Sequence, residues 1–96
     1  MNFNKIKSLQ KQYGFDTTQK MINDGSIWKL QGSAGREAMS TLECGACMLP
    51  KSDKYDYYGN LVPSRDRLKK GTKGTYQNSL GFWQRVEDGE IFLELN

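Results

Sequence analysis

The sequence predicts a small α+β domain in which three to four short helices alternate with the strands of a three-stranded sheet. Apolar residues recur at helical spacing in several stretches. Three segments also share one pattern, in which an apolar residue, two further residues and a glycine precede a short apolar run. These segments are INDGSIWKL, LECGACML and VEDGEIFL, at residues 22–30, 42–49 and 86–93. Because glycine commonly ends helices, we interpret each segment as a helix end followed by a strand.

The N-terminal segment, residues 1–14, predicts a first helix. Its apolar side chains recur every three to four residues over 3–13, and Gly14 ends the pattern. A second helix is expected to begin at a capping box, in which Asp16 accepts from backbone N–H groups and Gln19 reaches back. Gly25 ends this helix.

The middle of the chain continues the same alternation. We expect a strand over residues 26–31, after the second helix. Ser33 is a favourable N-cap for a third helix, which Gly45 ends. The short apolar run at 46–49 predicts the next strand.

Residues 80–95 allow two interpretations. Asp88-Gly89 lies between alternating residues, which is typical of a hairpin with strands at 81–87 and 90–95. The apolar residues before the glycine also fit one face of a helix. The repeated pattern favours the second interpretation, with a helix that ends at the glycine and a strand after it.

The composition describes a single domain over residues 1–96. Hydrophobic residues make up 36% of the chain and aromatic residues 11%, as in folded proteins. The net charge of +3 is too small to indicate nucleic-acid binding by itself. No apolar run is long enough for a membrane span, and the N-terminus lacks the apolar region of a secretory signal. With two cysteines, these features predict a cytoplasmic protein with reduced thiols.

Catalysis and metal binding have little support. The chain has no histidine, which excludes Ser–His and Cys–His nucleophiles. Cys44 and Cys47 form a C-x-x-C motif, but it straddles the end of the third helix, where the dipole does not lower a thiol pKa. Zinc needs four ligands, and the two cysteines supply two. We therefore predict a non-catalytic protein without metal or cofactor, whose cysteines are structural.

Two stretches carry candidate binding residues. The first opens the third helix, where small residues and free N–H groups suit an anion. The second is residues 50–79, a Gly- and Tyr-rich segment interpreted as a functional loop. The predicted phosphate-binding residues are Gly32, Ser33, Gly35, Arg36, Ser64, Arg65, Arg67 and Lys73. The predicted base-stacking or interface residues are Tyr55, Tyr57, Tyr58 and Asn60.

Each stretch also has a plain structural interpretation. The first is more typical of an ordinary turn with a serine cap than of an anion site. The second is equally typical of a solvated basic loop whose tyrosines pack onto the core.

Several motifs extend over residues 21–83. They are IWKL at 27–30, GSAGREAM at 32–39, GACMLP at 45–50, YYGNLVPSR at 57–65 and GTKG at 71–74. Together they resemble a pattern in small uncharacterised accessory proteins of tailed bacteriophages and prophages. The resemblance implies an anti-defence protein in the cytoplasm of an infected bacterium, where it binds a host defence protein or sequesters a nucleotide signal.

Three functions follow from these observations. The first is a nucleotide-binding protein that acts as a sponge for an immune signal, and we expect it to be a homo-oligomer because so small a chain does not bury a ligand alone. The second is an inhibitor that binds a host defence protein through the tyrosine-rich basic loop. The third is a nucleic-acid-binding protein, which the modest net charge makes weaker.

Overall fold

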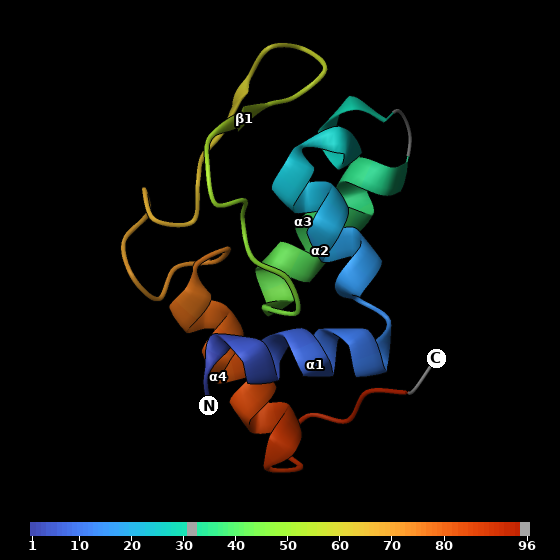
Figure 1. Ribbon diagram of the computed structural model, residues 1–96, viewed down its shortest axis with the longest axis vertical. Helices are drawn as coiled ribbons and strands as arrows, with labels where there is room; N and C mark the ends of the chain where they lie inside the picture. The colour runs from blue at the N-terminus through green and yellow to red at the C-terminus, as the bar shows by residue number, and fades with distance from the viewer. Residues whose placement is uncertain (31–32, 95–96) are drawn as a thin grey trace.

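The computed structural model describes residues 1–30 and 33–94. Within them the chain forms four α-helices, one 3₁₀ helix and a two-stranded antiparallel hairpin (Figure 1). In chain order these are α1 (Phe3–Tyr13), α2 (Asp16–Asp24), η1 (Ser26–Lys29), α3 (Ser33–Cys44), β1 (Lys54–Tyr55), β2 (Leu61–Val62) and α4 (Tyr76–Glu87). None of these helices has both the length and the hydrophobicity needed to span a membrane.

The three glycines of the repeated pattern end helices, as predicted. Gly25, Gly45 and Gly89 have φ angles of 83°, 103° and 77°, in the left-handed region. The N–H of Gly89 donates to the carbonyl of Val86 at 3.1 Å and closes the end of α4. The helix expected before Gly89 is therefore confirmed, and the hairpin interpretation of residues 80–95 is wrong.

The strands expected after these glycines are absent from the described residues. Residues 26–29 form η1, and residues 30 and 90–94 lie in no strand. The remaining predicted positions, residues 31 and 95, lie outside the described residues. The three-stranded sheet was therefore a wrong prediction, because the periodicity of such short apolar runs does not distinguish a strand from another buried segment.

The apolar run at 46–49 is a buried central segment rather than a strand. Its side chains alternate between two hydrophobic clusters. Ala46 and Met48 belong to the first cluster, whereas Cys47 and Leu49 belong to the second. The short apolar run that suggested a strand is thus a buried segment whose alternate side chains enter two parts of a helical core.

Side chains, not a neighbouring strand, satisfy the backbone of this central segment. The Gln19 amide pairs with Met48, accepting from its N–H at 2.8 Å and donating to its carbonyl at 2.9 Å. Gln10 and Trp83 both donate to the carbonyl of Ala46, at 2.9 and 3.2 Å. Since buried backbone groups need partners, these side chains replace a β-ladder.

The capping box predicted at the start of α2 was wrong. Asp16 is the first residue of α2, and the N-cap is Phe15, which makes no side-chain capping bond. Gln19 does not reach back to the helix start because its amide binds the central segment. α3 begins at Ser33, and the residue before it lies outside the described residues, so the N-cap at Ser33 stays a prediction.

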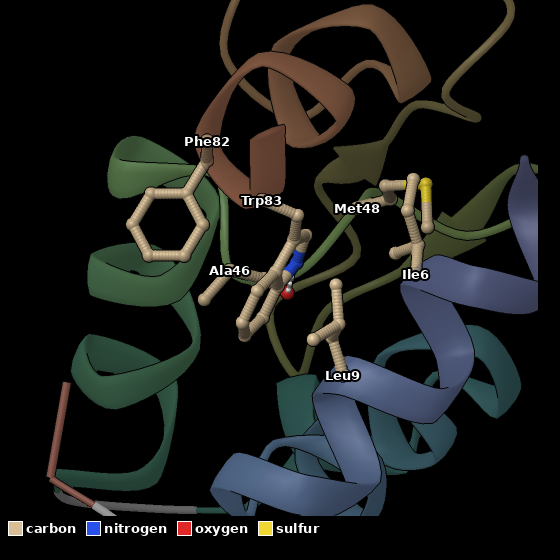
Figure 2. Packing of buried hydrophobic residues seen from close by; sticks show 6 residues of the cluster. All are labelled: Ile6, Leu9, Ala46, Met48, Phe82 and Trp83. Atoms are coloured by element: carbon tan, nitrogen blue, oxygen red, sulfur yellow. Dashed lines mark hydrogen bonds between the residues drawn. The ribbon is translucent and has the colours of Figure 1, made fainter. Parts of the chain in front are cut away.

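The first hydrophobic cluster joins α1, α4 and the central segment (Figure 2). Trp83 is fully buried, and its ring meets Phe82 edge to face, with centroids 5.0 Å apart. Figure 2 shows its indole N–H directed at the carbonyl oxygen of Ala46. The buried members are Ile6, Leu9, Ala46, Met48, Phe82 and Trp83.

The second cluster lies among α2, η1 and α3. Its buried members are Ile22, Ile27, Ala38, Leu42, Cys47 and Leu49. Ile27 anchors η1 in this cluster, and the neighbouring Trp28 packs against it while remaining partly exposed. The core thus fixes η1 beside the start of α3.

The long segment after Pro50 is closed at its base. The N–H of Leu49 donates to the carbonyl of Gly74 at 2.8 Å, and the N–H of Arg65 donates to that of Pro50 at 2.9 Å. The hairpin extends from this base toward η1 (Figure 1). The predicted loop over 50–79 is shorter than expected, because its last residues form the first turn of α4.

Candidate functional site

An open cleft of about 690 Å³ lies where η1, α3 and the tip of the β1–β2 hairpin meet. We call it the aromatic cleft. Its volume is in the range of small-ligand sites, but it is open to solvent rather than enclosed. The lining residues are Trp28, Leu30, Gly35, Arg36, Met39, Asp56, Tyr57 and Tyr58.

One wall of the cleft is a face of α3. Gly35 and Met39 are one helical turn apart, and Arg36 lies beside them. A Cβ placed on Gly35 would meet no atom within 4 Å, so the helix surface is open there. Arg36 is exposed, and no ion pair of the described residues includes it. This wall therefore presents a free guanidinium beside an apolar side chain.

The opposite wall is the hairpin tip, which hydrogen bonds hold in shape. The Asp56 carboxylate accepts from the backbone N–H groups of Tyr58 and Asn60, at 2.9 and 2.8 Å. The Asn60 side chain also donates to Asp56, at 3.3 Å. The N–H of Tyr57 donates to the carbonyl of Trp28 at 3.1 Å, which ties the tip to η1. Asn60, predicted to contact a base, thus stabilises the turn.

The two tyrosines at this tip are exposed. The exposed fraction is 62% for Tyr57 and 84% for Tyr58, and their rings meet edge to face with centroids 5.3 Å apart. This excludes the interpretation in which these tyrosines pack onto the core. The backbone of the tip, rather than burial of the rings, sets their position.

A smaller groove of about 300 Å³ continues from the aromatic cleft. The two share Trp28, Met39 and Asp56, and the groove adds Leu61 and Lys73 to the surface. The indole N–H of Trp28 is buried and has no acceptor among the described residues. An unsatisfied buried donor is uncommon in native proteins, and here it lies between the two hollows.

Arg65 was predicted to bind phosphate, but its side chain is buried beside the central segment. It is 7% exposed, its Nε donates to the carbonyl of Leu49 at 2.7 Å, and its Nη2 donates to Asn23 at 3.0 Å. Burial lowers the pKa of this guanidinium. Arg65 therefore supports the core and does not line the aromatic cleft.

Ser64 and Arg67 lie together at the base of the hairpin. Arg67 binds Asp53 with its Nε, at 2.9 and 2.8 Å from the two carboxylate oxygens, and with its Nη2 at 2.6 Å. The N–H of Ser64 donates to the same carboxylate at 2.9 Å. The hydrogen bonds from Arg67 and Ser64 hold the pKa of Asp53 below its usual value. These residues connect the two ends of the hairpin.

The other predicted site residues divide between the cleft and its surroundings. Gly32 lies outside the described residues, and Ser33 is exposed but does not line the cleft. Tyr55 is 57% exposed on β1, also outside the cleft. Lys73 lines the adjoining groove. The structure brings together Gly35, Arg36, Tyr57 and Tyr58.

Four residues that line the aromatic cleft were not predicted as site residues from the sequence. Trp28 and Leu30 were assigned to a strand, and Asp56 looked like an ordinary loop acid. Met39 could have been found, because it lies one helical turn after Gly35, on the face of α3 that carried the predicted site. Nothing in the local sequence indicates that η1 meets the hairpin tip.

The C-x-x-C motif lies at the end of α3, as predicted. Cys44 is the last helical residue and is exposed, whereas Cys47 is buried in the second cluster. Burial raises the pKa of the Cys47 thiol to about 12, which disfavours the reactive thiolate. The described residues hold no cluster of acidic residues and cysteines able to bind a metal ion.

Comparison of the chain with protein-family models, curated proteins and solved structures finds no match. The resemblance to phage accessory proteins therefore remains a prediction.

Proposed function

We propose that this protein is a non-catalytic binding protein that recognises a protein partner through the aromatic cleft and its adjoining groove. The observation that carries the proposal is the distribution of exposed apolar side chains. Of the eight large ones that are more than 40% exposed in the described residues, five line these two hollows. They are Leu30, Met39, Tyr57, Tyr58 and Leu61.

The residue types also favour a protein interface. Tyrosine, tryptophan, methionine and arginine are enriched at the centres of such interfaces, where a few of them carry most of the binding energy. Tyr57 and Tyr58 lose little conformational freedom on binding because the hydrogen-bonded turn already fixes their backbone. Trp28 adds a large apolar surface to the floor.

The charges define the chemistry of the expected partner. Among the described residues, Arg36 is the only Lys or Arg that lines the aromatic cleft, and Lys73 lines the adjoining groove. The Asp56 carboxylate already accepts hydrogen bonds from the turn. We expect an apolar side chain of the partner to enter the cleft and a carboxylate beside it to pair with Arg36. With the resemblance to phage proteins, the proposed partner is a host defence protein in the bacterial cytoplasm.

Site-specific photo-crosslinking tests this proposal. A photoreactive phenylalanine analogue replaces Tyr58 in one variant and Tyr55 in a matched control, since Tyr55 is exposed but does not line the cleft. In bacterial lysate, we expect one discrete crosslinked protein from position 58 and none from position 55. Equal products at both positions would contradict a specific interface.

The captured protein then allows a quantitative measurement. We expect Tyr57→Ala and Arg36→Glu each to weaken its binding by about thirtyfold or more, the loss typical of hot-spot residues, and Tyr55→Ala to have little effect. Calorimetry with the purified proteins measures these affinities. Unchanged binding in the cleft variants would contradict the proposal.

A nucleotide-binding function is the second candidate, and one observation favours it. Gly35 and Arg36 line the same cleft as Tyr57 and Tyr58, so a phosphate group and a base could be bound together. Because the cleft is open, we expect a homo-oligomer to enclose the ligand. Calorimetry with cyclic and linear nucleotides tests this: micromolar binding that Arg36→Ala abolishes would favour a nucleotide, and absence of binding would exclude it.

A further inference from the structure

A second pocket, of about 330 Å³, lies between α1 and α2. We call it the basic pocket. It shares no lining residue with the aromatic cleft or the adjoining groove. The lining residues are Phe3, Lys7, Gln10, Asp16, Gln19, Lys20, Asn23 and Lys51.

The charges of this lining are unbalanced. Lys7, Lys20 and Lys51 come from three different segments, and Asp16 is the single acid, so the lining carries three positive charges and one negative charge, a net +2. None of these lysines forms an ion pair within the described part of the chain. Lys5, on another face of α1, does so with Glu87 at 3.1 Å. The lining of the pocket therefore carries an excess of positive charge, and its lysines are not held in ion pairs within the described residues.

The wall of the pocket also offers an oriented amide donor. The side-chain oxygen of Asn23 accepts from Gln19 and from Arg65, both at 3.0 Å. These two bonds fix which end of the amide is the oxygen. The NH₂ group of Asn23 has no acceptor among the described residues, so it is available to a bound anion.

Arg65 adds a buried charge behind this wall. Its hydrogen bonds go to neutral groups, the carbonyl of Leu49, the amide of Asn23 and the sulfur of Met48. Within the described residues it has no carboxylate partner at ion-pair distance. Asp66 attracts this guanidinium electrostatically, but burial outweighs the attraction and lowers the pKa of Arg65. Burying a charge that has no ion-pair partner is costly, and an anion in the neighbouring pocket would offset part of that cost. The centroid of the Phe3 ring lies 5.8 Å from both Arg65 Cζ and Lys51 Nζ, so one ring neighbours both the buried charge and a lysine of the pocket.

We infer that the basic pocket binds a phosphate group, either as inorganic phosphate or as the phosphate of a small ester. The net charge of the lining matches a dianion, and lysine ammonium groups bind phosphate as point charges from several directions. The Asn23 amide supplies a hydrogen bond with defined direction. This inference does not depend on the proposed function of the aromatic cleft.

A nuclear magnetic resonance titration of the ¹⁵N-labelled full chain tests the inference. Sodium phosphate and, separately, phenyl phosphate are added while sodium chloride keeps the ionic strength constant. We expect saturable shifts of the side-chain NH₂ signals of Asn23 and Gln19, with little change at Tyr58. Tighter binding of phenyl phosphate would identify the ester as the preferred form, and tighter binding of inorganic phosphate the free ion. Shifts that do not saturate, or that spread over all lysine-rich surfaces, would overturn the site.

Two triple variants distinguish phosphate binding at the basic pocket from general electrostatic attraction to the protein. Lys7→Gln/Lys20→Gln/Lys51→Gln removes the lysines of the pocket, whereas Lys11→Gln/Lys69→Gln/Lys70→Gln removes three exposed lysines elsewhere. Each changes the net charge from +3 to 0. We expect the first to weaken phosphate binding at least tenfold and the second less than twofold. Equal losses in both variants would overturn the inference. All six side chains are exposed, so both variants should fold.

Discussion

The aromatic residues on the α1–α4 side of the molecule and those at the hairpin tip are used in opposite ways. Trp83 is fully buried and Phe82 is 5% exposed, whereas Tyr57 and Tyr58 are 62% and 84% exposed. On the first side the rings contribute burial to folding. At the tip they contribute almost none, so their presence there needs another explanation. The part of this small chain that stabilises the fold therefore differs from the part that we propose binds a partner.

The difference has a physical origin in the elements that carry these rings. Two helices of eleven and twelve residues pack their apolar faces together on the α1–α4 side. The hairpin has strands of two residues each, too short to present a continuous face to a core. Its shape instead comes from backbone and Asp56 hydrogen bonds, which leave the side chains exposed.

The largest expected effect is the loss of the central ring. Trp83→Ala removes a fully buried side chain, so we expect the free energy of unfolding to fall by about 3–5 kcal/mol. Trp83→Phe keeps a ring but loses the hydrogen bond to Ala46, and should cost less. Urea denaturation measures both. If Trp83→Ala cost less than Trp83→Phe, the assignment of this side as the stabilising core would fail.

An intermediate effect is expected at two of the helix-ending glycines. Both Gly45 and Gly89 have positive φ, for which a side chain costs about 1–2 kcal/mol. A Cβ on Gly45 would also lie 2.7 Å from that of Phe82, whereas a Cβ on Gly89 would meet nothing within 4 Å. We therefore expect Gly45→Ala to destabilise the fold more than Gly89→Ala in urea denaturation. Equal losses would show that contact with the core adds nothing at Gly45.

The smallest expected effect on stability is at the hairpin tip. Because Tyr58 is 84% exposed, Tyr58→Ala should change the free energy of unfolding by less than about 0.5 kcal/mol. The same variant should lose binding to the captured partner. Thermal and urea denaturation of the variant measure the first quantity, and calorimetry measures the second. A large loss of stability would contradict the statement that the hairpin tip contributes almost nothing to folding.

The helices were predictable from the sequence, whereas the central segment was not. The predicted first helix matches α1, and the glycines that end helices act through local backbone geometry. The partners of residues 46–49 are side chains far away in sequence, such as Gln19 and Trp83. No local pattern shows that a glutamine will take the place of a neighbouring strand, so the short apolar run was interpreted as part of a sheet.

The residue types of the candidate site were predictable from the sequence, but the groups that each of these residues contacts were not. Arg36 and Arg67 look alike in sequence as phosphate-binding candidates. Arg36 lines the aromatic cleft, whereas Arg67 is held by Asp53, fourteen positions before it. The position of Trp28 beside Tyr57 likewise depends on a backbone hydrogen bond between distant segments. Sequence alone shows which groups are present, and folding decides which of them remain free.

The closed base of the segment after Pro50 has a consequence for how such a protein can diversify. The bond from Leu49 to Gly74 and the burial of Arg65 fix where this segment leaves and rejoins the core. Changes in length at the tip between them would add little closure entropy, because that cost grows only slowly with loop length. The sequence and length of the exposed tip could therefore change during evolution while the helical body stays the same, as the variable loops of antibodies change on a constant framework.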